Sequence, residues 1–484
     1  MSARLGDILP QGLSAPAGAE ALTVGGLALD SRRVTPGDLF AALPGVRTDG
    51  RRFIEMAVEN GAVAVLAPPG STATVPVIEA EDTPAALAAI AARFYPRQPA
   101  TTAAVTGTNG KSSTVEFLRQ IWAGAGLEAA CLGTLGVTRA AGRTEVGYTT
   151  PDAVALHRSL DALAGEGVTH LAMEASSHGL KQRRMDGVRV DLAAFTNLSQ
   201  DHLDYHPDFE DYFASKMRLF SALTVSGAPA VVWMDSDWSA RVAEAARGAG
   251  LDVIEVGWRG RDLQVGEITP RAASQDVTFS WRGAERAVNL PLVGEFQTAN
   301  ALVAAVLAIA GGVSADDTFA ALERLTGVAG RLQQVGRTPD GAPILVDFAH
   351  TPDGLDHLLR AARPHTRGQI HLVFGAGGDR DPSKREKMGV VAAKLADRII
   401  VTDDNPRSEA PEAIRAAVLK GCPHAQEIGD REAAIRAGIL GLEAGDVLLI
   451  AGKGHETGQI VGDRVIPFEE AGVVRRILDE EGAP

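Results

Sequence analysis

The chain is poor in cysteine and has no long apolar run. Cys131 and Cys422 are its two cysteines, and neither stands in a CxxC pattern or at metal-ligand spacing from a histidine. A disulfide framework and a structural zinc site are therefore not expected. No window of 18 apolar residues occurs, and the segment MSARLGDILPQGL at the N-terminus has no uninterrupted apolar core. We expect no membrane span, no export signal and a place in the reducing cytoplasm.

Aromatic residues and excess positive charge are also scarce. Only 5% of the residues are aromatic, and 61 acidic side chains outnumber 47 basic ones, which gives a formal net charge of −14. Nucleic-acid binding depends on clustered cations, so it is not expected. Hydrophobic residues make up 45% of the 484, beside 53 glycines, as in α/β proteins with many tight turns. The length suits roughly three domains of about 150 residues each.

Turn signals and apolar runs predict where these domains lie. Pro96 and Pro99 indicate a hinge after a first region of short apolar runs, and we predict domains over residues 1–98, 99–333 and 334–484. Later apolar runs are separated by helical pattern, which predicts parallel sheets that bind ligands at the carboxyl ends of their strands. The predicted strands are residues 103–107, 168–176, 192–197, 228–235, 251–257, 343–350, 369–378, 397–404 and 446–454, and a helix is predicted over 298–310.

A glycine-rich segment, TGTNGKSST (106–114), follows the first of these strands. Its amides from Gly107 to Lys111 can form an anion-binding nest at a helix N-terminus, with Lys111 on the β and γ phosphates and the Ser112 hydroxyl on Mg²⁺. The strict GxxxxGK[ST] pattern is not met, because Val105 stands five residues before Gly110. The alternative interpretation is a glycine turn that only caps the next helix.

Motifs downstream of this loop resemble those of the Mur ligases, the ATP-dependent amide-forming enzymes of bacterial wall precursor synthesis. That family shares the short loop TGTNGK[ST][ST], a strand ending in MEASSHGL (173–180), then NLSQDHLDYH (197–206) and a helix containing Lys216. All occur here in this order, and the resemblance runs from about residue 22 to 470. It implies an α/β protein whose central P-loop ATPase-like parallel-sheet domain is flanked by a small N-terminal uridine-nucleotide domain and a C-terminal Rossmann-like domain that binds the incoming amino acid.

The resemblance implies an ATP and magnesium site in the central domain. Two Mg²⁺ ions are expected, and CO₂ converts Lys216 into a carbamate that acts as a carboxylate-like ligand. Taken alone, a strand-end glutamate, a lone histidine or a helix lysine is usually structural. The implied catalytic residues are Lys111, Glu174, His202 and Lys216, and the implied metal ligands are Ser112, Glu174, His202 and Lys216. The implied ATP-binding residues are Thr106, Gly107, Thr108, Asn109, Gly110, Lys111, Ser112, Ser113, Asn300, Arg331 and Asp347.

The N-terminal segments LDSRR (29–33) and VRTDG (46–50) resemble the uridine-nucleotide module of the family. On local sequence alone, a surface turn with a capped helix explains them equally well. The chain departs from the family at Tyr148, where asparagine is frequent, and at Gln297, where FNxxN is usual. The residues implied to bind the UDP substrate are Leu29, Ser31, Val46, Arg47, Thr48, Thr149, Thr150, Ser176, Gln182 and Arg184.

The C-terminal segment TDDNPR (402–407) is the most specific motif of the chain. In this family DNPR accompanies meso-diaminopimelate, whereas relatives that add L-lysine lack the arginine. Diaminopimelate has one more carboxylate than lysine, and a guanidinium pairs with a carboxylate through two parallel hydrogen bonds. The alternative is a turn that opens the next helix, with Pro406 near its first position. The residues implied to bind the amino acid are Arg380, Asp404, Asn405, Pro406, Arg407, Gly452 and Glu456.

Taken together, the resemblance implies a ligase that adds meso-2,6-diaminopimelate to UDP-N-acetylmuramoyl-L-alanyl-D-glutamate through an acyl phosphate, with ATP as co-substrate. Such a reaction serves peptidoglycan synthesis, and hence cell shape and division. The expected partners are these two substrates and ATP, without nucleic acid or membrane, and a monomer is expected. Two alternatives stay open. A folylpolyglutamate synthetase-like ligase would lack the uridine module and DNPR, and a nonligase P-loop nucleotide-binding module would need only residues 103–125.

Overall fold

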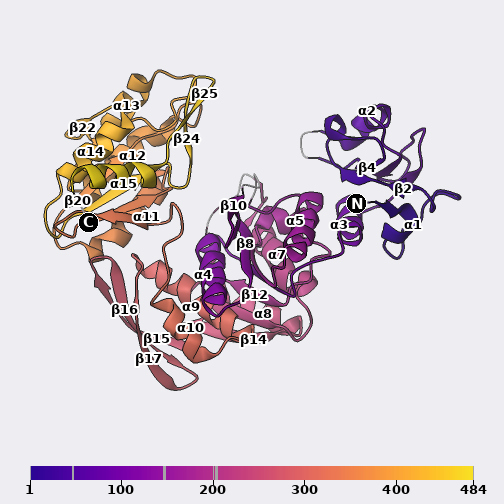
Figure 1. Ribbon diagram of the computed structural model, residues 1–484, viewed down its shortest axis with the longest axis horizontal. Helices are drawn as coiled ribbons and strands as arrows, with labels where there is room; N and C mark the ends of the chain where they lie inside the picture. The colour runs from indigo at the N-terminus through magenta and orange to yellow at the C-terminus, as the bar shows by residue number, and fades with distance from the viewer. Residues whose placement is uncertain (1, 46–47, 145–148, 200, 202–204, 483–484) are drawn as a thin grey trace. The chain divides into compact units, whose positions relative to one another are not determined.

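A computed structural model gives the fold of residues 2–45, 48–144, 149–199, 201 and 205–482, which are the described residues (Figure 1). The chain divides into two compact units, residues 1–261 with 303–314 and residues 262–302 with 315–484. Within the described ranges, no helix is both long and apolar enough to cross a membrane.

The first unit begins with a small parallel sheet, in the strand order β3-β4-β5-β6. Every residue of β4 and β5 is buried, as in strands covered on both faces. Leu87 and Ile90 of helix α3 share one core with Leu39 and Leu66 of the sheet. The elements are β1 (Ala3–Arg4), α1 (Leu5–Ile8), β2 (Thr23–Val24), β3 (Gly26–Ala28), η1 (Ser31–Arg33), β4 (Asp38–Ala41), η2 (Gly50–Phe53), α2 (Ile54–Glu59), β5 (Ala64–Ala67), β6 (Val77–Glu79) and α3 (Thr83–Phe94).

The larger sheet of this unit is mainly parallel and has the order β10-β9-β8-β11-β7-β12-β13-β14. Strand β9 pairs antiparallel with both of its neighbours, β8 and β10, whereas the other strand pairs in this order are parallel. The strands predicted over residues 103–107, 168–176, 192–197, 228–235 and 251–257 are confirmed. The elements are β7 (Thr101–Thr106), α4 (Lys111–Gly124), β8 (Ala129–Gly133), β9 (Gly136–Arg139), β10 (Gly142–Thr144), α5 (Ala153–Gly165), β11 (His170–Glu174), α6 (Ser177–Lys181), β12 (Leu192–Phe195), α7 (Phe209–Arg218), η3 (Leu219–Leu223), β13 (Pro229–Trp233), α8 (Ser239–Gly248) and β14 (Asp252–Gly257).

The second unit contains a sheet of order β18-β19-β23-β20-β21-β22, parallel except for β18. One core joins it to α11, α12 and α13, and another joins it to α14 and α15. Helices therefore cover both faces, as the alternating strand and helix pattern predicts. The elements are α10 (Ala315–Leu322), β18 (Gln333–Arg337), β19 (Pro343–Asp347), α11 (Pro352–Ala362), η4 (Arg363–His365), β20 (Ile370–Phe374), α12 (Ser383–Leu395), β21 (Arg398–Val401), α13 (Pro411–Leu419), β22 (Gln426–Glu427), α14 (Arg431–Leu440), β23 (Val447–Ala451) and α15 (Glu470–Glu480).

Two antiparallel parts of this unit were not predicted from the sequence. Strands β15 (Leu263–Arg271), β16 (Ser274–Trp281) and β17 (Ala284–Leu290) form a meander, and β24 (Gly458–Val461) pairs with β25 (Arg464–Pro467) as a hairpin. Every second residue of β16 is buried. In the sequence this strand therefore appears as alternating polar and apolar residues and not as an apolar run. The helix predicted over 298–310 is α9 (Glu295–Ala310).

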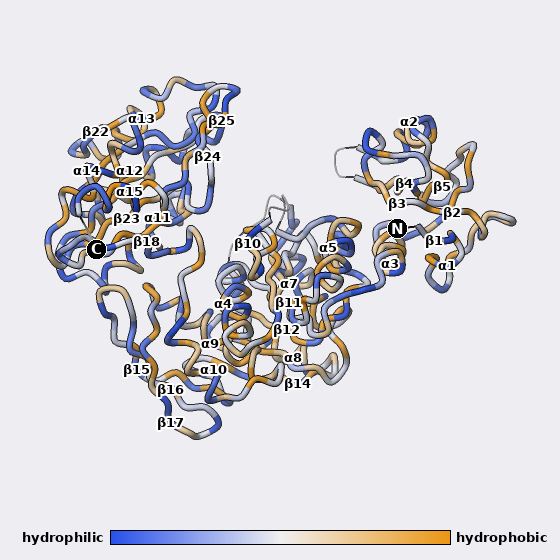
Figure 2. Tube along the Cα trace, in the orientation of Figure 1, coloured by the Kyte–Doolittle hydropathy of each residue, from blue (hydrophilic) through white to orange (hydrophobic). Residues whose placement is uncertain are grey.

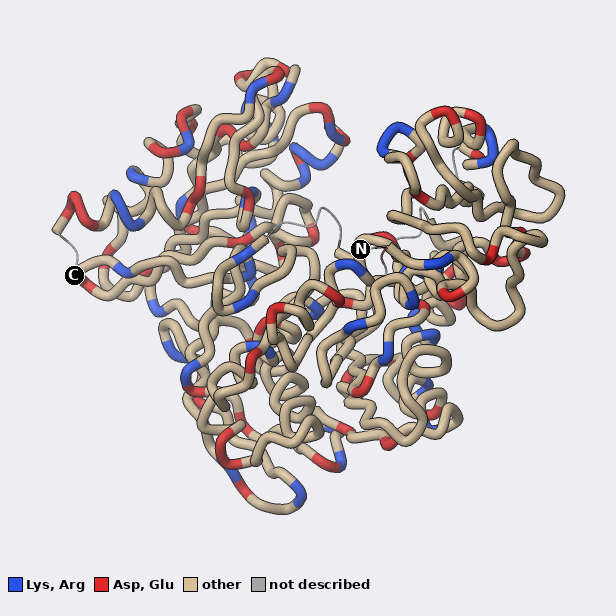
Figure 3. The backbone as a smooth tube through the Cα atoms, turned by 45° about the vertical axis from the view of Figure 1, so that its right-hand side comes forward, with Lys and Arg blue, Asp and Glu red and all other residues tan. Residues whose placement is uncertain are grey.

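Figures 2 and 3 show where apolar and charged residues lie along the chain. Figure 2 shows apolar segments along the buried strands and hydrophilic segments at many loops. Figure 3 shows basic and acidic residues interspersed along the chain. Cys131 and Cys422 are both buried and free.

Candidate active site

The phosphate loop lies between β7 and α4, at the carboxyl edge of the larger sheet of the first unit. Gly107 has φ 150° and Gly110 has φ 87°, a backbone region that side chains disfavour. A Cβ atom on Gly107 would also collide with the Thr196 hydroxyl. Helix α4 begins at Lys111, directly after Gly110. The loop can therefore direct amides and a helix N-terminus at an anion.

Two lysines meet at one carbonyl of this loop. The Lys111 Nζ donates to Gly107 O at 3.0 Å, and the Lys216 Nζ donates to the same oxygen at 2.7 Å. Lys216 comes from α7 and is only 1% exposed. Burial and the positive charge of Lys111 hold the pKa of Lys216 well below its usual value, although Asp201 acts in the opposite direction. The neutral amine form is therefore more favourable for Lys216 than for an ordinary, exposed helix lysine.

Glu174 faces the loop from the end of β11, the neighbouring strand. Its carboxylate is 1% exposed and its Oε1 accepts from Ser112 Oγ at 2.9 Å and from the Thr134 amide at 2.8 Å. Gly133 makes this approach possible, because a Cβ there would collide with the Glu174 side chain. The sequence analysis named Ser112 and Glu174 but missed Gly133 and Thr134, whose only signal is their place at the end of β8.

The segment after β12 holds the loop from the other side. The Asn109 amide donates to Asn197 Oδ1 at 3.0 Å. The Ser199 amide donates to Thr108 Oγ1 at 3.0 Å, and this hydroxyl is also 3.0 Å from the Tyr212 hydroxyl. Tyr212 lies on α7 one turn before Lys216, whose Nζ is 4.4 Å from the centre of the tyrosine ring. Tyr212 therefore links the loop to the lysine, a role that its sequence did not reveal.

Three of the four predicted metal ligands lie among the described residues. Ser112, Glu174 and Lys216 all lie around the loop, whereas His202 lies outside the described residues. Among the described residues, no group of three His, Cys, Asp or Glu side chains could hold a metal ion. The predicted ligand set also contains a serine hydroxyl and a carbamate, and it stays a prediction.

The residues predicted to bind the muramoyl peptide form one polar cluster beside Glu174. The Thr150 hydroxyl donates to Glu174 O at 3.0 Å and lies 2.9 Å from Ser176 Oγ. Arg184 donates from Nη1 to Thr150 O at 2.8 Å and from Nε to Gln182 Oε1 at 3.0 Å. Thr149 joins the same surface, since its hydroxyl is 2.9 Å from that of Thr134. Tyr148 lies outside the described residues.

The predicted uridine-binding residues surround η1 and the loop that precedes η2. Ser31 is buried, and its hydroxyl lies 3.3 Å from the Met56 sulfur. The Asp30 carboxylate caps η1 through the Arg32 amide, so the capped-turn interpretation of this segment also holds. Val46 and Arg47 lie outside the described residues.

In the second unit, four loops meet at the carboxyl edge of the parallel sheet. One follows β19, which ends at Asp347. The others follow β23, β20 and β21 and carry Gly452–Glu456, Gly375–Arg380 and Thr402–Arg407 respectively. Glycines allow the loops to touch, because a Cβ on Gly378 would collide with the Pro406 carbonyl and one on Gly452 with the Asp404 carboxylate. The predicted convergence of these segments is therefore observed.

The residues predicted for ATP in this unit also lie near one another. Asp347 accepts the Leu332 and Ala349 amides, each at 2.8 Å. Burial raises the pKa of the Asp347 carboxyl in spite of these bonds. The Arg331 guanidinium lies 5.6 Å from the ring centre of Phe348.

Asn300 is connected to this region through Gln297, the residue that departs from the family pattern. Asn300 Nδ2 donates to Gln297 Oε1 at 3.1 Å, and Gln297 Nε2 donates to Arg331 O at 3.2 Å. Both side chains are almost fully buried. Gln297 therefore links the start of α9 to the backbone at Arg331 through its side-chain hydrogen bonds.

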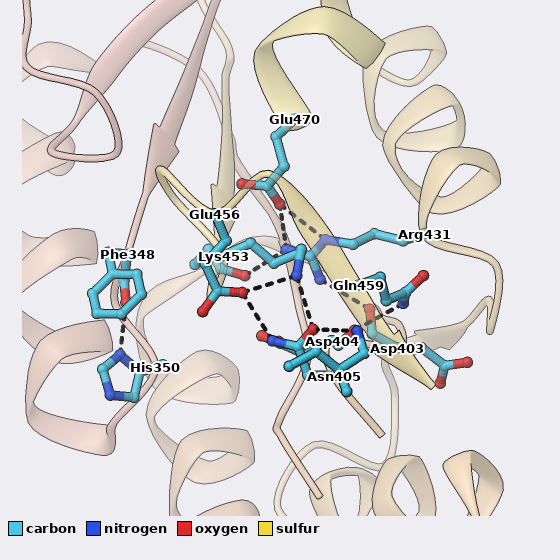
Figure 4. A network of polar contacts seen from close by, with 12 residues as sticks. Phe348, His350, Asp403, Asp404, Asn405, Arg431, Lys453, Glu456, Gln459 and Glu470 are labelled. Atoms are coloured by element: carbon cyan, nitrogen blue, oxygen red, sulfur yellow. Dashed lines mark hydrogen bonds and ion pairs between the residues drawn. The ribbon is translucent and has the colours of Figure 1, made fainter. Parts of the chain in front are cut away.

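Of the predicted amino-acid-binding residues, Asp404, Asn405 and Glu456 lie in a partly buried network of polar contacts (Figure 4). Asp404 and Asn405 are buried, and Asn405 Nδ2 donates to Glu456 Oε2 at 2.8 Å. Arg407 has φ 53°, an uncommon value for arginine, and its Nη1 donates to Gly378 O at 2.7 Å. Arg380 is exposed. Helix α13 begins at Pro411, so the alternative in which Pro406 opens the next helix is wrong.

Three charged residues of this network were missed from the sequence. Lys453 is fully buried between Asn405 and Glu456, and Arg431 forms a fully buried ion pair with Glu470 (Figure 4). Lys453 had a signal, since it stands between two glycines after a buried strand. Arg431 and Glu470 begin two helices and look like ordinary first-turn residues until the fold buries them.

Comparison with known proteins identifies the family. The Mur ligase family catalytic domain matches residues 23–95, the Mur ligase middle domain 105–308, and the Mur ligase glutamate ligase domain 330–454. A relative from Chelativorans sp. (strain BNC1), named UDP-N-acetylmuramoyl-L-alanyl-D-glutamate--2,6-diaminopimelate ligase, is 52% identical over 480 residues, which cover 99% of each chain. The chain belongs to the Mur ligase family. The predicted family, ligase class and three-part α/β architecture are thus confirmed.

Solved structures of Mur ligases and their relatives show the same architecture. A UDP-N-acetylmuramoyl-L-alanyl-D-glutamate--2,6-diaminopimelate ligase covers 100% of both chains at 30% identity, with a TM-score of 0.77. A Mycobacterium tuberculosis folylpolyglutamate synthase, solved with ADP and AMPPCP, covers 82% of this chain and 95% of its own at 18% identity, with a TM-score of 0.61. The second likeness shows a shared fold and not a shared substrate.

Proposed function

We propose that this Mur ligase joins meso-2,6-diaminopimelate to UDP-N-acetylmuramoyl-L-alanyl-D-glutamate, with hydrolysis of ATP to ADP and phosphate. The observation that carries the proposal is the presence in one chain of a phosphate loop bordered by two lysines and a strand-edge network containing Asn405, Arg407 and Glu456. Relatives about half identical over the full chain bear the name of this reaction. We further propose that the enzyme acts in the cytoplasm, as a monomer, in peptidoglycan synthesis and hence in cell shape and division.

The phosphate loop is proposed to activate the substrate carboxylate. Amides from Gly107 to Lys111 would bind the triphosphate, and Lys111 would turn from the Gly107 carbonyl to the β and γ phosphates. The ATP site would include Thr106, Asn300, Arg331 and Asp347. Transfer of the γ-phosphoryl group to the D-glutamyl carboxylate gives an acyl phosphate, which the amine of the incoming amino acid attacks with loss of phosphate.

Magnesium is proposed to bind at Ser112, Glu174, His202 and carbamylated Lys216. The donor chemistry fits, because Ser112 and Glu174 oxygens are already 2.9 Å apart beside the loop. The lowered pKa of Lys216 favours its neutral amine, the form that attacks CO₂ and then loses a proton. Bound magnesium would offset the repulsion between the triphosphate and the acceptor carboxylate.

The UDP end of the substrate is proposed to lie against Leu29, Ser31 and the segment 46–48, and its peptide against the cluster of Thr149, Thr150, Ser176, Gln182 and Arg184. The uridine, ATP and amino-acid domains are proposed to span residues 1–98, 99–333 and 334–484. Because the ligands are divided among these domains, domain closure would assemble the site and exclude water from the acyl phosphate.

The incoming amino acid is proposed to bind at Arg380, Asp404, Asn405, Pro406, Arg407, Gly452 and Glu456. Arg407 would pair with the carboxylate that distinguishes diaminopimelate from lysine. When lysine is offered, this guanidinium would be left without its partner, which disfavours lysine.

Phosphate release in the presence of single and combined substrates tests the proposal. We expect ATP-dependent release only when the UDP-muramoyl dipeptide and diaminopimelate are both present, with a product heavier than the dipeptide by diaminopimelate minus water. Release with a folate and glutamate instead would support the folylpolyglutamate synthetase-like alternative. Nucleotide binding without any ligated product would support the nonligase alternative.

A further inference from the structure

Lys453 is a fully buried ammonium in the second unit that the proposed reaction does not use. It follows β23, and its side chain has 0% exposure. Its Nζ donates to Asn405 Oδ1 at 3.1 Å and to Glu456 Oε2 at 3.0 Å (Figure 4). Asn405 Nδ2 also donates to Glu456 Oε2, at 2.8 Å. The three side chains thus form a closed triangle.

Such a lysine is costly unless it is paired. An isolated buried charge is strongly disfavoured, so a buried cation is normally matched by an anion and by acceptors. The other cation in this network, Arg431, donates to Glu470 at 2.9 Å and to the carbonyls of Asp403 and Ala451. Glu456 is therefore the carboxylate that directly balances Lys453.

The triangle fixes the orientation of the Asn405 amide and of the Glu456 carboxylate. Asn405 Oδ1 accepts from Lys453, and it also accepts from the Ile460 amide at 2.9 Å. These two bonds fix the orientation of the amide group and therefore the direction in which its Nδ2 donates. The Glu456 side chain is 34% exposed, and its Oε2 is the oxygen held by both partners. Burial alone would raise the pKa of Glu456, but the hydrogen bonds from Asn405 and Lys453 keep it below its usual value.

We propose that Lys453 is a positioning residue for the amino-acid site: it holds Asn405 and ionised Glu456 in one orientation before the substrate arrives. Glu456 Oε1 then accepts from a substrate ammonium group, while the second N–H of Asn405 donates to a substrate carboxylate. Lys453 itself stays behind the two side chains. The ligand class is an amino acid that presents both groups at its recognised end. This inference rests on the proposed function.

Lys453→Met tests it, because methionine keeps most of the volume and removes the charge. A side chain that only orients a binding residue typically contributes about 10-fold to 100-fold, as the outer partners of metal ligands do. We expect the KM for diaminopimelate to rise by that factor, while the KM values for ATP and the UDP substrate change by less than about twofold. Lys394→Met, on the exposed face of α12, removes the same charge and should change none of them.

The pH profile separates positioning from a loss of structure. Lys453, Asp404, Arg431, Glu470 and His455 are the charged or titratable groups that act on or near Glu456. Without Lys453, the pKa of Glu456 rises, so the acid limb of kcat/KM for diaminopimelate should move to higher pH. A merely structural role would lower activity without this displacement.

A double variant keeps the test decisive if Lys453→Met folds poorly. Lys453→Met/Glu456→Gln removes both charges, and it should lose less than about threefold relative to Glu456→Gln alone, since coupled residues are not additive. Independent losses that multiply, or a folded Lys453→Met with unchanged KM and pH profile, would overturn the inference. If wild-type phosphate release does not depend on diaminopimelate, the proposed function fails instead.

Discussion

The phosphate loop of the first unit and the amino-acid network of the second are built in different ways. In the loop, backbone groups dominate: two lysines share the Gly107 carbonyl, and the side chains of Asn197 and Glu174 hold main-chain amides. In the network, ion pairs dominate: Arg431 and Glu470 are both fully buried, and fully buried Lys453 pairs with the partly exposed Glu456. We therefore expect the loop to exchange its contacts when an anion binds, and we expect the network to be organised before its ligand arrives.

Lys216→Ala tests the phosphate loop and should cause the largest loss of activity. It removes the proposed carbamate ligand, and activity should fall by more than about 10⁴-fold, as for removal of one member of a catalytic unit. A short carboxylic acid should partly restore activity by replacing the missing oxygens. Steady-state rates with and without the acid measure both effects, and Lys394→Met is the matched control. Wild-type activity in Lys216→Ala would remove the carbamate from the mechanism.

Arg431→Met should show that the network depends on buried charge. The variant leaves Glu470 buried without its partner, which costs about 3 to 5 kcal/mol of unfolding free energy. Arg431→Met/Glu470→Leu removes both charges and should recover most of that loss. Chemical denaturation of the two variants and the wild type measures this. Equal destabilisation in both would mean that the pair is not what stabilises this region.

Arg407→Ala should affect recognition more than folding. Loss of a charge-assisted pair costs on the order of 2 to 5 kcal/mol, or roughly 30-fold to several thousand-fold in kcat/KM for diaminopimelate. Use of L-lysine should change far less, because lysine lacks the carboxylate that Arg407 would bind. The measurement is the ratio of kcat/KM for the two amino acids. If the ratio does not change, Arg407 does not recognise the distal carboxylate.

Gly378→Ala should perturb the network least. The new methyl group would collide with the Pro406 carbonyl, and overpacking of this kind costs about 1 to 3 kcal/mol. We expect the KM for diaminopimelate to rise by roughly 5-fold to 150-fold with little change for ATP. Gly248→Ala provides a control elsewhere, since Gly248 lies in helix α8 and no atom lies within 4 Å of a Cβ there. An ATP effect as large as the diaminopimelate effect would contradict a local role for Gly378.

The sequence predicts the parts of this protein that local residue patterns specify. Apolar runs that end in polar residues identified β7, β11, β12, β19, β20, β21 and β23, and with them the loops that carry Lys111, Glu174 and Arg407. The β15–β17 meander was missed because its strands alternate polar and apolar residues between turns. Arg431 and Glu470 were missed because their pairing joins residues 39 positions apart. Lys453 had a local signal, its place between two glycines after a buried strand, but its burial against Asn405 and Glu456 depends on the tertiary fold.

The proposed division of labour places carboxylate activation at the phosphate loop and amino-acid recognition at the network. Chemical trapping of the acyl phosphate, with ATP and the UDP-muramoyl dipeptide but without diaminopimelate, tests it most directly. Lys111→Ala should give no trapped intermediate while still binding the UDP substrate in calorimetry. Arg407→Ala should give as much trapped intermediate as the wild type, although its ligation rate falls. Loss of the intermediate in Arg407→Ala, or its persistence in Lys111→Ala, would contradict the account.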